Sequence, residues 1–270
     1  MPAKVWFITG TSRGFGRVWA QAALERGDRV AATARSLASI DDLAVKYGDA
    51  VQLLSLDVSD REAVRAAVTA AHERFGRLDV VVNNAGYGLF GAVEDVTEEQ
   101  ARAQFDTNFF GTLWVTQAVL PILRSQGDGH ILNMSSIAGI ASWPMLGLYH
   151  ASKWAIEGLG DSLAQEVARF GIRVTLVEPG PYRTDWRGSS AVWAEPGAAY
   201  AEWAEAPSAG SLPGDPAATA GPLMEIVDSP DPPLRVFLGA SALDTARRVY
   251  EDRIHTWEQW DPVARAAQGD

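Results

Sequence analysis

The chain has 270 residues, 47% of them hydrophobic, enough to bury one large core or two small ones. Its net charge of -11 argues against a surface that binds nucleic acid or an anionic membrane. The absence of cysteine excludes disulfides, thiolate catalysis and cysteine-ligated metals, and it fits a reducing compartment. We therefore expect a cytoplasmic protein. The four histidines show no metal-binding spacing, so we expect no metal site.

The N-terminal stretch holds an apolar run of only five residues, too short for a signal peptide or a membrane span. It begins a series of short apolar, β-branched runs that alternate with helical segments. The runs cover residues 4–9, 29–34, 51–56, 78–83, 130–135, 172–178 and 234–239. This alternation predicts an α/β fold, a Rossmann-type doubly wound parallel sheet flanked by helices on both faces.

Two further features divide the chain. Capping boxes, Ser59 with Glu62 and Thr97 with Gln100, predict the starts of two helices. Residues from about 186 to 233 are rich in proline, alanine, glycine and serine, and we expect no strand or long helix there. A long irregular insertion before a last strand and helix is typical of a lid, so we expect a single domain over residues 1–270 with a substrate lid.

The stretch "ITGTSRGFG" places Gly10, Gly14 and Gly16 between the first strand and the first helix. Glycines allow a tight turn and close approach to a pyrophosphate, which the free amides of the helix N-terminus then bind. The alternative is an ordinary turn, but the strand before it and the helix after it favour dinucleotide binding. No Gly-Lys-Ser/Thr follows, which excludes a Walker phosphate loop.

The end of the second strand bears on the choice between the two nicotinamide dinucleotides. Arg35 stands where an NAD-binding fold usually carries an acidic residue. Its guanidinium would pair with the 2′-phosphate of NADP, with Arg13 of the glycine turn as a second cation. The alternative is that both are solvated surface arginines. We expect NADP(H) as the cofactor.

Several separated motifs together resemble the short-chain dehydrogenase/reductase family over residues 4–184. These motifs are "TGTSRGFG", "DV" at residues 57–58, "NNAG" at 83–86, Asn108, "NMSS" ending at Ser136, "YHASK" from Tyr149, and "PGPYRT" from Pro179. The resemblance implies a proton-relay site of Asn108, Ser136, Tyr149 and Lys153 beside a nicotinamide. Family spacing to the tyrosine favours Ser136 over Ser135.

With the glycine turn, the resemblance also implies a set of cofactor-binding residues. The set comprises Gly10, Ser12, Arg13, Gly14, Phe15, Gly16, Arg35, Asp57, Val58, Asn84, Ala85, Gly86, Tyr149, Lys153, Pro179, Gly180, Tyr182 and Thr184. Asp57 and Val58 would border the adenine, Asn84 and Gly86 its ribose, and the residues from Pro179 onward the nicotinamide.

The chemistry of carbonyl reduction gives independent reasons for these side chains. Hydride addition leaves an alkoxide that must be protonated. An adjacent lysine cation and the positive nicotinamide ring of the oxidised cofactor would together lower the pKa of a tyrosine toward neutrality. The Ser136 hydroxyl would donate to the same oxygen. The alternatives are a buried amide at a helix distortion for Asn108, a turn cap for Ser136, and an ordinary helix face for Tyr149 and Lys153. We expect His150 to face away from the substrate.

Aromatic residues gather in the lid and in the loop after Ser136: Trp143, Trp186, Trp193, Tyr200 and Trp203. They would line a site for an apolar substrate, with Trp143 and Trp186 as contacts beside Ser136 and Tyr149, or they would fasten the lid or a subunit contact. Both interpretations stay open.

These observations predict an NADP(H)-dependent carbonyl reductase or alcohol dehydrogenase acting on a small molecule. Two alternatives are a non-enzymatic NADP sensor and an epimerase or dehydratase that retains its nicotinamide. Relatives are commonly dimers or tetramers through two long helices. Those would correspond here to residues 97–123 and 149–170, so we expect a homo-oligomer.

Overall fold

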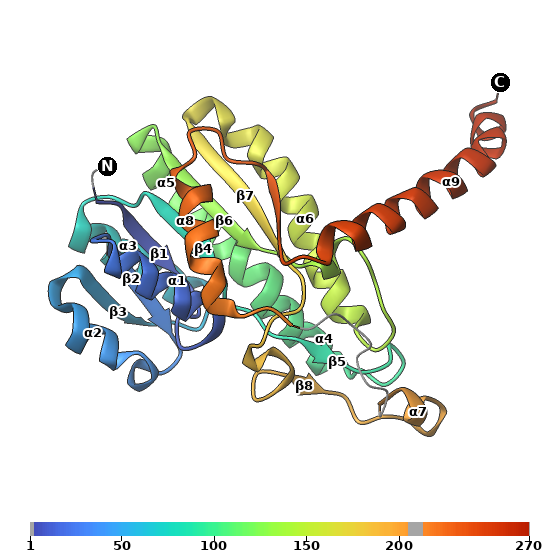
Figure 1. Cartoon of the computed structure of the whole chain (residues 1–270), viewed down its shortest axis with the longest axis horizontal. Coiled ribbons are helices and arrows are strands. Elements are labelled where there is room, and N and C mark those ends of the chain that lie inside the picture. The colour runs from blue at the N-terminus through green and yellow to red at the C-terminus, as the bar shows by residue number, and fades with distance from the viewer. Residues whose placement is uncertain (1–2, 205–212, 270) are drawn as a thin grey trace.

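The computed structural model describes residues 3–204 and 213–269, centred on a seven-stranded parallel sheet of order β3-β2-β1-β4-β6-β7-β9 (Figure 1). The strands are β1 Val5–Ile8, β2 Arg29–Ala34, β3 Val51–Ser55, β4 Val80–Asn83, β6 Gly129–Met134, β7 Ile172–Pro179 and β9 Arg235–Leu238. All seven predicted strands are present, with ends within two residues of expectation. The predicted doubly wound parallel sheet is confirmed.

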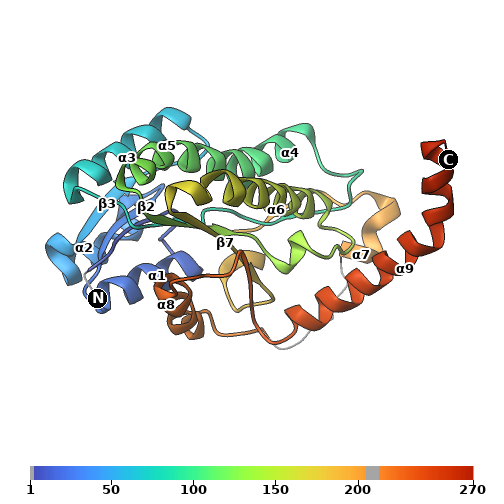
Figure 2. The same cartoon turned by 90° about the horizontal axis from the view of Figure 1, so that it is seen from above.

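Helices cover both faces of this sheet, as Figure 2 shows from above. They are α1 Gly14–Glu25, α2 Asp41–Tyr47, α3 Arg61–Phe75, α4 Glu98–Phe105, α5 Gly111–Gln126, α6 Gly147–Val167, α7 Ala201–Ala204, α8 Ala220–Asp228 and α9 Ala242–Gln268. Alternation along β1 divides the core: Trp6 and Ile8 pack with α1, α2 and α8, and Val5 and Phe7 pack with α3, α5 and α6.

The strand order reverses beside β1, because the chain adds β2 and β3 on one side and returns to add β4, β6 and β7 on the other. Ligands of open α/β sheets bind outside the carboxyl ends of the strands at such a switch point. The glycine turn follows β1 and residues 84–86 follow β4, so the predicted cofactor residues flank this crevice.

One of the two predicted capping boxes is wrong. Thr97 and Gln100 form the expected reciprocal box at the start of α4. At α3 the N-cap is Asp60, whose carboxylate accepts from the amides of Glu62 and Ala63. Ser59 lies one residue too early, and its hydroxyl donates to Asp57 Oδ1 instead.

The predicted lid is more ordered than expected. Strand β8, Val192–Trp193, pairs in parallel with β5, Leu89–Phe90, as a second small sheet. Helix α8, at the end of the same segment, buries Leu223, Ile226 and Val227 in the core beneath α1. The expectation that no strand would form here is therefore wrong. Residues 205–212, in the middle of the predicted lid, lie outside the described residues.

The apolar stripe on α5 belongs to the core. Val115 and Val119, within the segment 97–123 that corresponds to a subunit contact of relatives, are fully buried against the sheet. Within residues 3–204 and 213–269, no helix is long and apolar enough to cross a membrane. The same ranges hold no group of three or more acidic or histidine side chains that could bind a metal ion.

A buried histidine makes the stability of the sheet depend on pH. His130 in β6 donates from Nε2 to Thr175 Oγ1 at 2.9 Å, because that hydroxyl donates in turn to the carbonyl of Pro233. Its Nδ1 has no partner among the described residues, and burial lowers its pKa to about 3. The unfolded chain, with a histidine pKa near 6.5, therefore takes up this proton first as pH falls.

We expect the free energy of unfolding to fall through this group by about 1.4 kcal/mol per pH unit below roughly pH 6.5 and towards pH 3. His130→Gln cannot titrate but keeps a donor for Thr175, so its stability should fall less steeply in acid. Urea unfolding at several pH values measures both slopes. Parallel curves for the two proteins would contradict the assignment.

Candidate active site

The turn after β1 has the backbone that a bound pyrophosphate requires. Gly10 and Gly14 adopt φ angles of 70° and 59°, which side chains other than glycine rarely tolerate. Helix α1 begins without a side-chain cap and has no acidic residue in its first turn, so its amides and positive dipole end are open to an anion. Asn84 braces the turn, because its Nδ2 donates to the carbonyls of Thr9 and Gly10 at 2.8 and 3.0 Å. These residues fit a dinucleotide.

The two predicted phosphate-binding arginines differ in their surroundings. Arg35 is exposed just after β2, and its side chain forms no ion pair with a described residue. Arg13 is also exposed, but it donates to Ser189 Oγ at 2.6 Å and lies 3.6 Å from the Asp185 carboxylate. Arg13 therefore ties the glycine turn to the segment after β7.

The remaining predicted cofactor residues lie at the same edge of the sheet. Val58, after β3, is buried against Gly111 of α5. A Cβ on Gly111 would come within 2.6 Å of the Val58 side chain. The Tyr182 ring, after β7, packs edge-on to Phe15 at 5.0 Å. Exposed or half-buried residues complete the rim: Ser12, Asp57, Ala85, Gly86, Gly180 and Thr184.

Three of the four predicted catalytic residues come together at the start of α6. Tyr149 is buried, and the nearby Ser136 hydroxyl lowers its pKa. The Ser136 hydroxyl also accepts from the Ala138 amide at 3.0 Å and donates to the Pro179 carbonyl at 3.5 Å. Lys153 lies one helical turn further on, with Nζ 5.8 Å from the centre of the Tyr149 ring and donating to the Met134 carbonyl at 2.7 Å. Ser136 thus faces the phenol, whereas the neighbouring Ser135 donates to the buried carboxylate of Glu157.

The electrostatics of this group differ from the expectation of an acidic phenol. Burial raises the pKa of Tyr149 to about 12, and the hydrogen bond from Ser136 offsets only part of that rise. Burial lowers the pKa of Lys153 to about 8, against the attraction of Glu157. Desolvation is therefore the largest cause of both pKa shifts.

Asn108 occupies a helix distortion between α4 and α5. Residues Asp106–Phe110 form a π-helical turn, in which the buried Asn108 amide faces inward. Its side chain accepts from the Tyr87 amide and donates to the Tyr87 carbonyl and to Ser152 Oγ, each at 3.1 Å. Asn108 thus joins the loop after β4 to α6, and its partner on α6, Ser152, is the residue before Lys153.

His150 has a structural role that the sequence did not reveal. It is buried, Nδ1 bonds the Ala138 carbonyl at 3.0 Å, and Nε2 accepts from the Trp143 amide at 3.0 Å. One ring nitrogen donates and the other accepts, so the ring is neutral, and burial lowers its pKa. His150 therefore holds the loop that follows Ser136 against α6. No local pattern signals this role, because it depends on how that loop folds back.

The lid aromatics divide between the two interpretations. The Trp186 ring lies 5.0 Å from the Tyr149 ring and 4.9 Å from the Phe90 ring, so it borders the phenol and also holds the predicted lid against β5. Trp193 stacks on Phe90 at 4.4 Å, which holds the lid down. Trp143 is 43% exposed, and its ring contact is with His150, at 5.5 Å.

Two aromatics lie further along the lid. Tyr200 donates to Glu94 at 2.9 Å, and Trp203 is 47% exposed. Neither has a ring contact with the described residues of the catalytic group.

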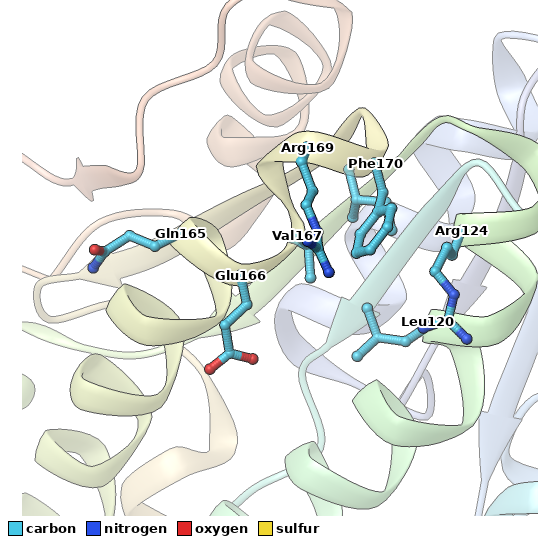
Figure 3. A pocket seen from close by; sticks show the side chains of 8 residues that line it. Leu120, Arg124, Gln165, Glu166, Val167, Arg169 and Phe170 are labelled. Atoms are coloured by element: carbon cyan, nitrogen blue, oxygen red, sulfur yellow. The ribbon is translucent and has the colours of Figure 1, made fainter.

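A separate open hollow of about 530 Å³ lies at the opposite edge of the sheet (Figure 3). It is bordered by the last turns of α5 and α6 and by Ile172, the first residue of β7. Arg124 and Arg169 both lie against the ring of Phe170 there, at 5.8 and 4.6 Å from its centre. It contains none of the predicted site residues, so it is separate from the crevice above the carboxyl ends of the strands.

Comparison with known proteins agrees with this geometry. The family model described as short chain dehydrogenase matches residues 4–195. "Oxidoreductase BOA17" of Botryotinia fuckeliana is 43% identical over 98% of this chain and 99% of its own.

Solved structures extend the likeness to the whole fold. A short-chain dehydrogenase from Streptomyces avermitilis superposes with a TM-score of 0.92 at 39% identity, covering 98% of both chains. An alcohol dehydrogenase from Thermococcus sibiricus, complexed with 5-hydroxy-NADP, is 29% identical over 87% of this chain and 96% of its own, with a TM-score of 0.74. Another similar structure, from Burkholderia phymatum, holds NAD. The chain is therefore an oxidoreductase of the short-chain dehydrogenase/reductase family.

Proposed function

We propose that the chain interconverts a carbonyl group and a secondary alcohol on an apolar small molecule, with NADP(H) as its cofactor. The observation that carries the proposal is the grouping of the buried Tyr149 phenol with the Ser136 hydroxyl, which acts on its pKa, and with the Lys153 ammonium one helical turn away. A phenol is a proton donor and acceptor, and a second hydroxyl beside it stabilises an oxyanion.

Bound NADP(H) supplies or accepts the hydride. Tyr149 gives its proton to the substrate oxygen that becomes negative, and a pKa of about 12 keeps the phenol protonated at neutral pH. Ser136 donates a hydrogen bond to the same oxygen, and the Lys153 charge stabilises the phenolate that results.

The surroundings suit an apolar substrate. Trp186 borders the phenol and Trp143 lies on the loop after Ser136, so both would contact the substrate. Asn108 supports the site by fixing the loop after β4 against α6. We place this activity in the cytoplasm, because a chain without cysteine has no disulfide to lose in a reducing compartment.

The test is a panel of apolar ketones and aldehydes assayed with NADPH and NADH side by side. We expect cofactor oxidation that requires a carbonyl compound and is faster with NADPH. Cofactor that stays tightly bound while substrate changes without net oxidation would indicate an epimerase or dehydratase instead. Binding of cofactor with no turnover of any compound would indicate a sensor.

Arg35 should set the preference for NADPH. We expect Arg35→Ala to weaken NADPH binding by about 10- to 100-fold and to leave NADH binding nearly unchanged, because only the 2′-phosphate pairs with the guanidinium. Titration of both cofactors measures the two dissociation constants. Arg65→Ala is the control, since Arg65 is an exposed α3 arginine paired with Glu62. If Arg35→Ala leaves the NADPH dissociation constant unchanged, Arg35 does not pair with the 2′-phosphate.

A further inference from the structure

The C-terminal helix α9 stands out from the body of the protein (Figures 1 and 2). Only Ala242 and Ala246 near its start are buried, against Ile137, Ile140 and Phe237.

Arg253 makes the last contact of α9 with the body. It donates to the Ile140 carbonyl at 2.9 Å and lies over the Trp154 ring at 4.7 Å. Every hydrogen bond and ion pair that the described residues after Arg253 form is within α9 itself. The outer half of the helix therefore has no support from its own subunit.

This projecting helix carries an apolar stripe. Leu243, Tyr250, Ile254, Trp257 and Trp260 are 44% to 63% exposed. Separations of seven, four, three and three residues place them on one side of a helix. The opposite side carries the polar Gln259 and one exposed apolar residue, Val263.

An isolated helix of this kind is marginal in water, because most helical stability in proteins comes from packing an apolar face. Pro262 weakens the outer half further, since it removes one backbone hydrogen bond. The stripe therefore needs a covering surface.

We propose that α9 packs antiparallel against the α9 of a second copy of this chain. The stripe exposes on the order of 500 Å² of large side chains. Standard interfaces bury about 800 Å² per partner, of which roughly 60% is apolar. The apolar area thus matches what a dimer contact needs.

Charge along α9 agrees with this arrangement. Arg247 and Asp261 lie seven residues before and after Ile254, on the same side of the helix as the stripe, and within one copy they pair with Asp244 and Arg265. A two-fold axis at Ile254 sets Arg247 of each copy opposite Asp261 of the other, whereas parallel helices would oppose like charges. A membrane is the poorer partner, because α9 has five acidic residues against four arginines and the whole chain carries a charge of -11.

The solved relative from Streptomyces avermitilis aligns over 98% of this chain, so its chain also runs along most of α9.

The test is the molar mass of the full chain in solution, measured by light scattering across a dilution series. We expect Trp257→Glu combined with Trp260→Glu to lower the mass by a factor of two. Gln259→Glu combined with Ala266→Glu adds the same charge on the opposite side of α9 and should leave the mass unchanged. Circular dichroism checks that the body of each variant stays folded.

Charge reversal tests the antiparallel pairing. Asp261→Arg alone should weaken association at least tenfold, and adding Arg247→Asp should restore it. The proposal is overturned by an unchanged mass in the tryptophan variant, by a wild-type monomer that binds anionic vesicles instead, or by no rescue in the double charge variant.

Discussion

Replacing Tyr149 by phenylalanine is expected to lower kcat by about 1,000-fold, the largest effect of any single substitution in this chain. Phenylalanine keeps the ring that packs at 5.0 Å from Trp186, so the fold and the start of α6 should be unchanged. What is lost is the proton donor beside Ser136. NADPH binding should stay within about twofold, because an apolar ring of the same shape fills the same space.

Steady-state kinetics on whichever substrate the panel identifies measures kcat, and a fluorescence titration measures the binding of NADPH. Tyr200→Phe is the matched control, because it removes a phenol that is bonded to Glu94 on the lid. Undiminished turnover by Tyr149→Phe would overturn the assigned role. A parallel loss of cofactor binding would mean that the phenol holds the cofactor rather than moving a proton.

The frame of the site was predictable from the sequence, since local patterns encode it. Each strand is a short apolar run, and a glycine turn between a strand and a helix has few other uses. The positions of Tyr149 and Lys153 follow from one helical turn of spacing. Ser136 lies just after β6 and Tyr149 near the start of α6, the next long helix, so the loop between them brings the two together.

Features that depend on tertiary burial were not predictable. The Tyr149 pKa was expected to fall, yet burial raises it to about 12, and no local pattern reports that desolvation. The expectation that His150 faces away from the substrate stays a prediction, but its hydrogen bond to the Ala138 carbonyl of the folded-back loop was not foreseen. At α3, two neighbouring residues could both cap the helix, and Asp60 does so in place of Ser59.

Helix α8, in the predicted lid, was also not predictable from local sequence. Its sequence is interrupted by Pro222, which looks like a breaker, but proline is tolerated in the first turn of a helix. The helix then forms because Leu223, Ile226 and Val227 find an apolar surface beside α1. Only the part of the segment before α8, which β8 and Trp186 fasten over the site, fits the role of a lid.

The second large effect is expected at Gly16. A Cβ there would lie 2.5 Å from Asn84 Nδ2 and closer still to the Gly10 carbonyl oxygen, which is backbone and cannot turn away. Gly16→Ala must therefore push α1 away from the glycine turn. We expect it to lower the free energy of unfolding by about 2 to 3 kcal/mol. It should also weaken NADPH binding at least tenfold, since the open amides of α1 would no longer face the turn.

Gly158→Ala is the matched control for Gly16, because it is also helical and a Cβ there meets nothing within 4 Å. That substitution should stabilise the chain by about 0.5 to 1 kcal/mol through helix propensity alone. Urea unfolding and cofactor titration on both variants separate packing from propensity. Equal stability of the two variants would mean that the turn after β1 yields to an added methyl group. The close contact of Gly16 with Gly10 would then not be what shapes the cofactor site.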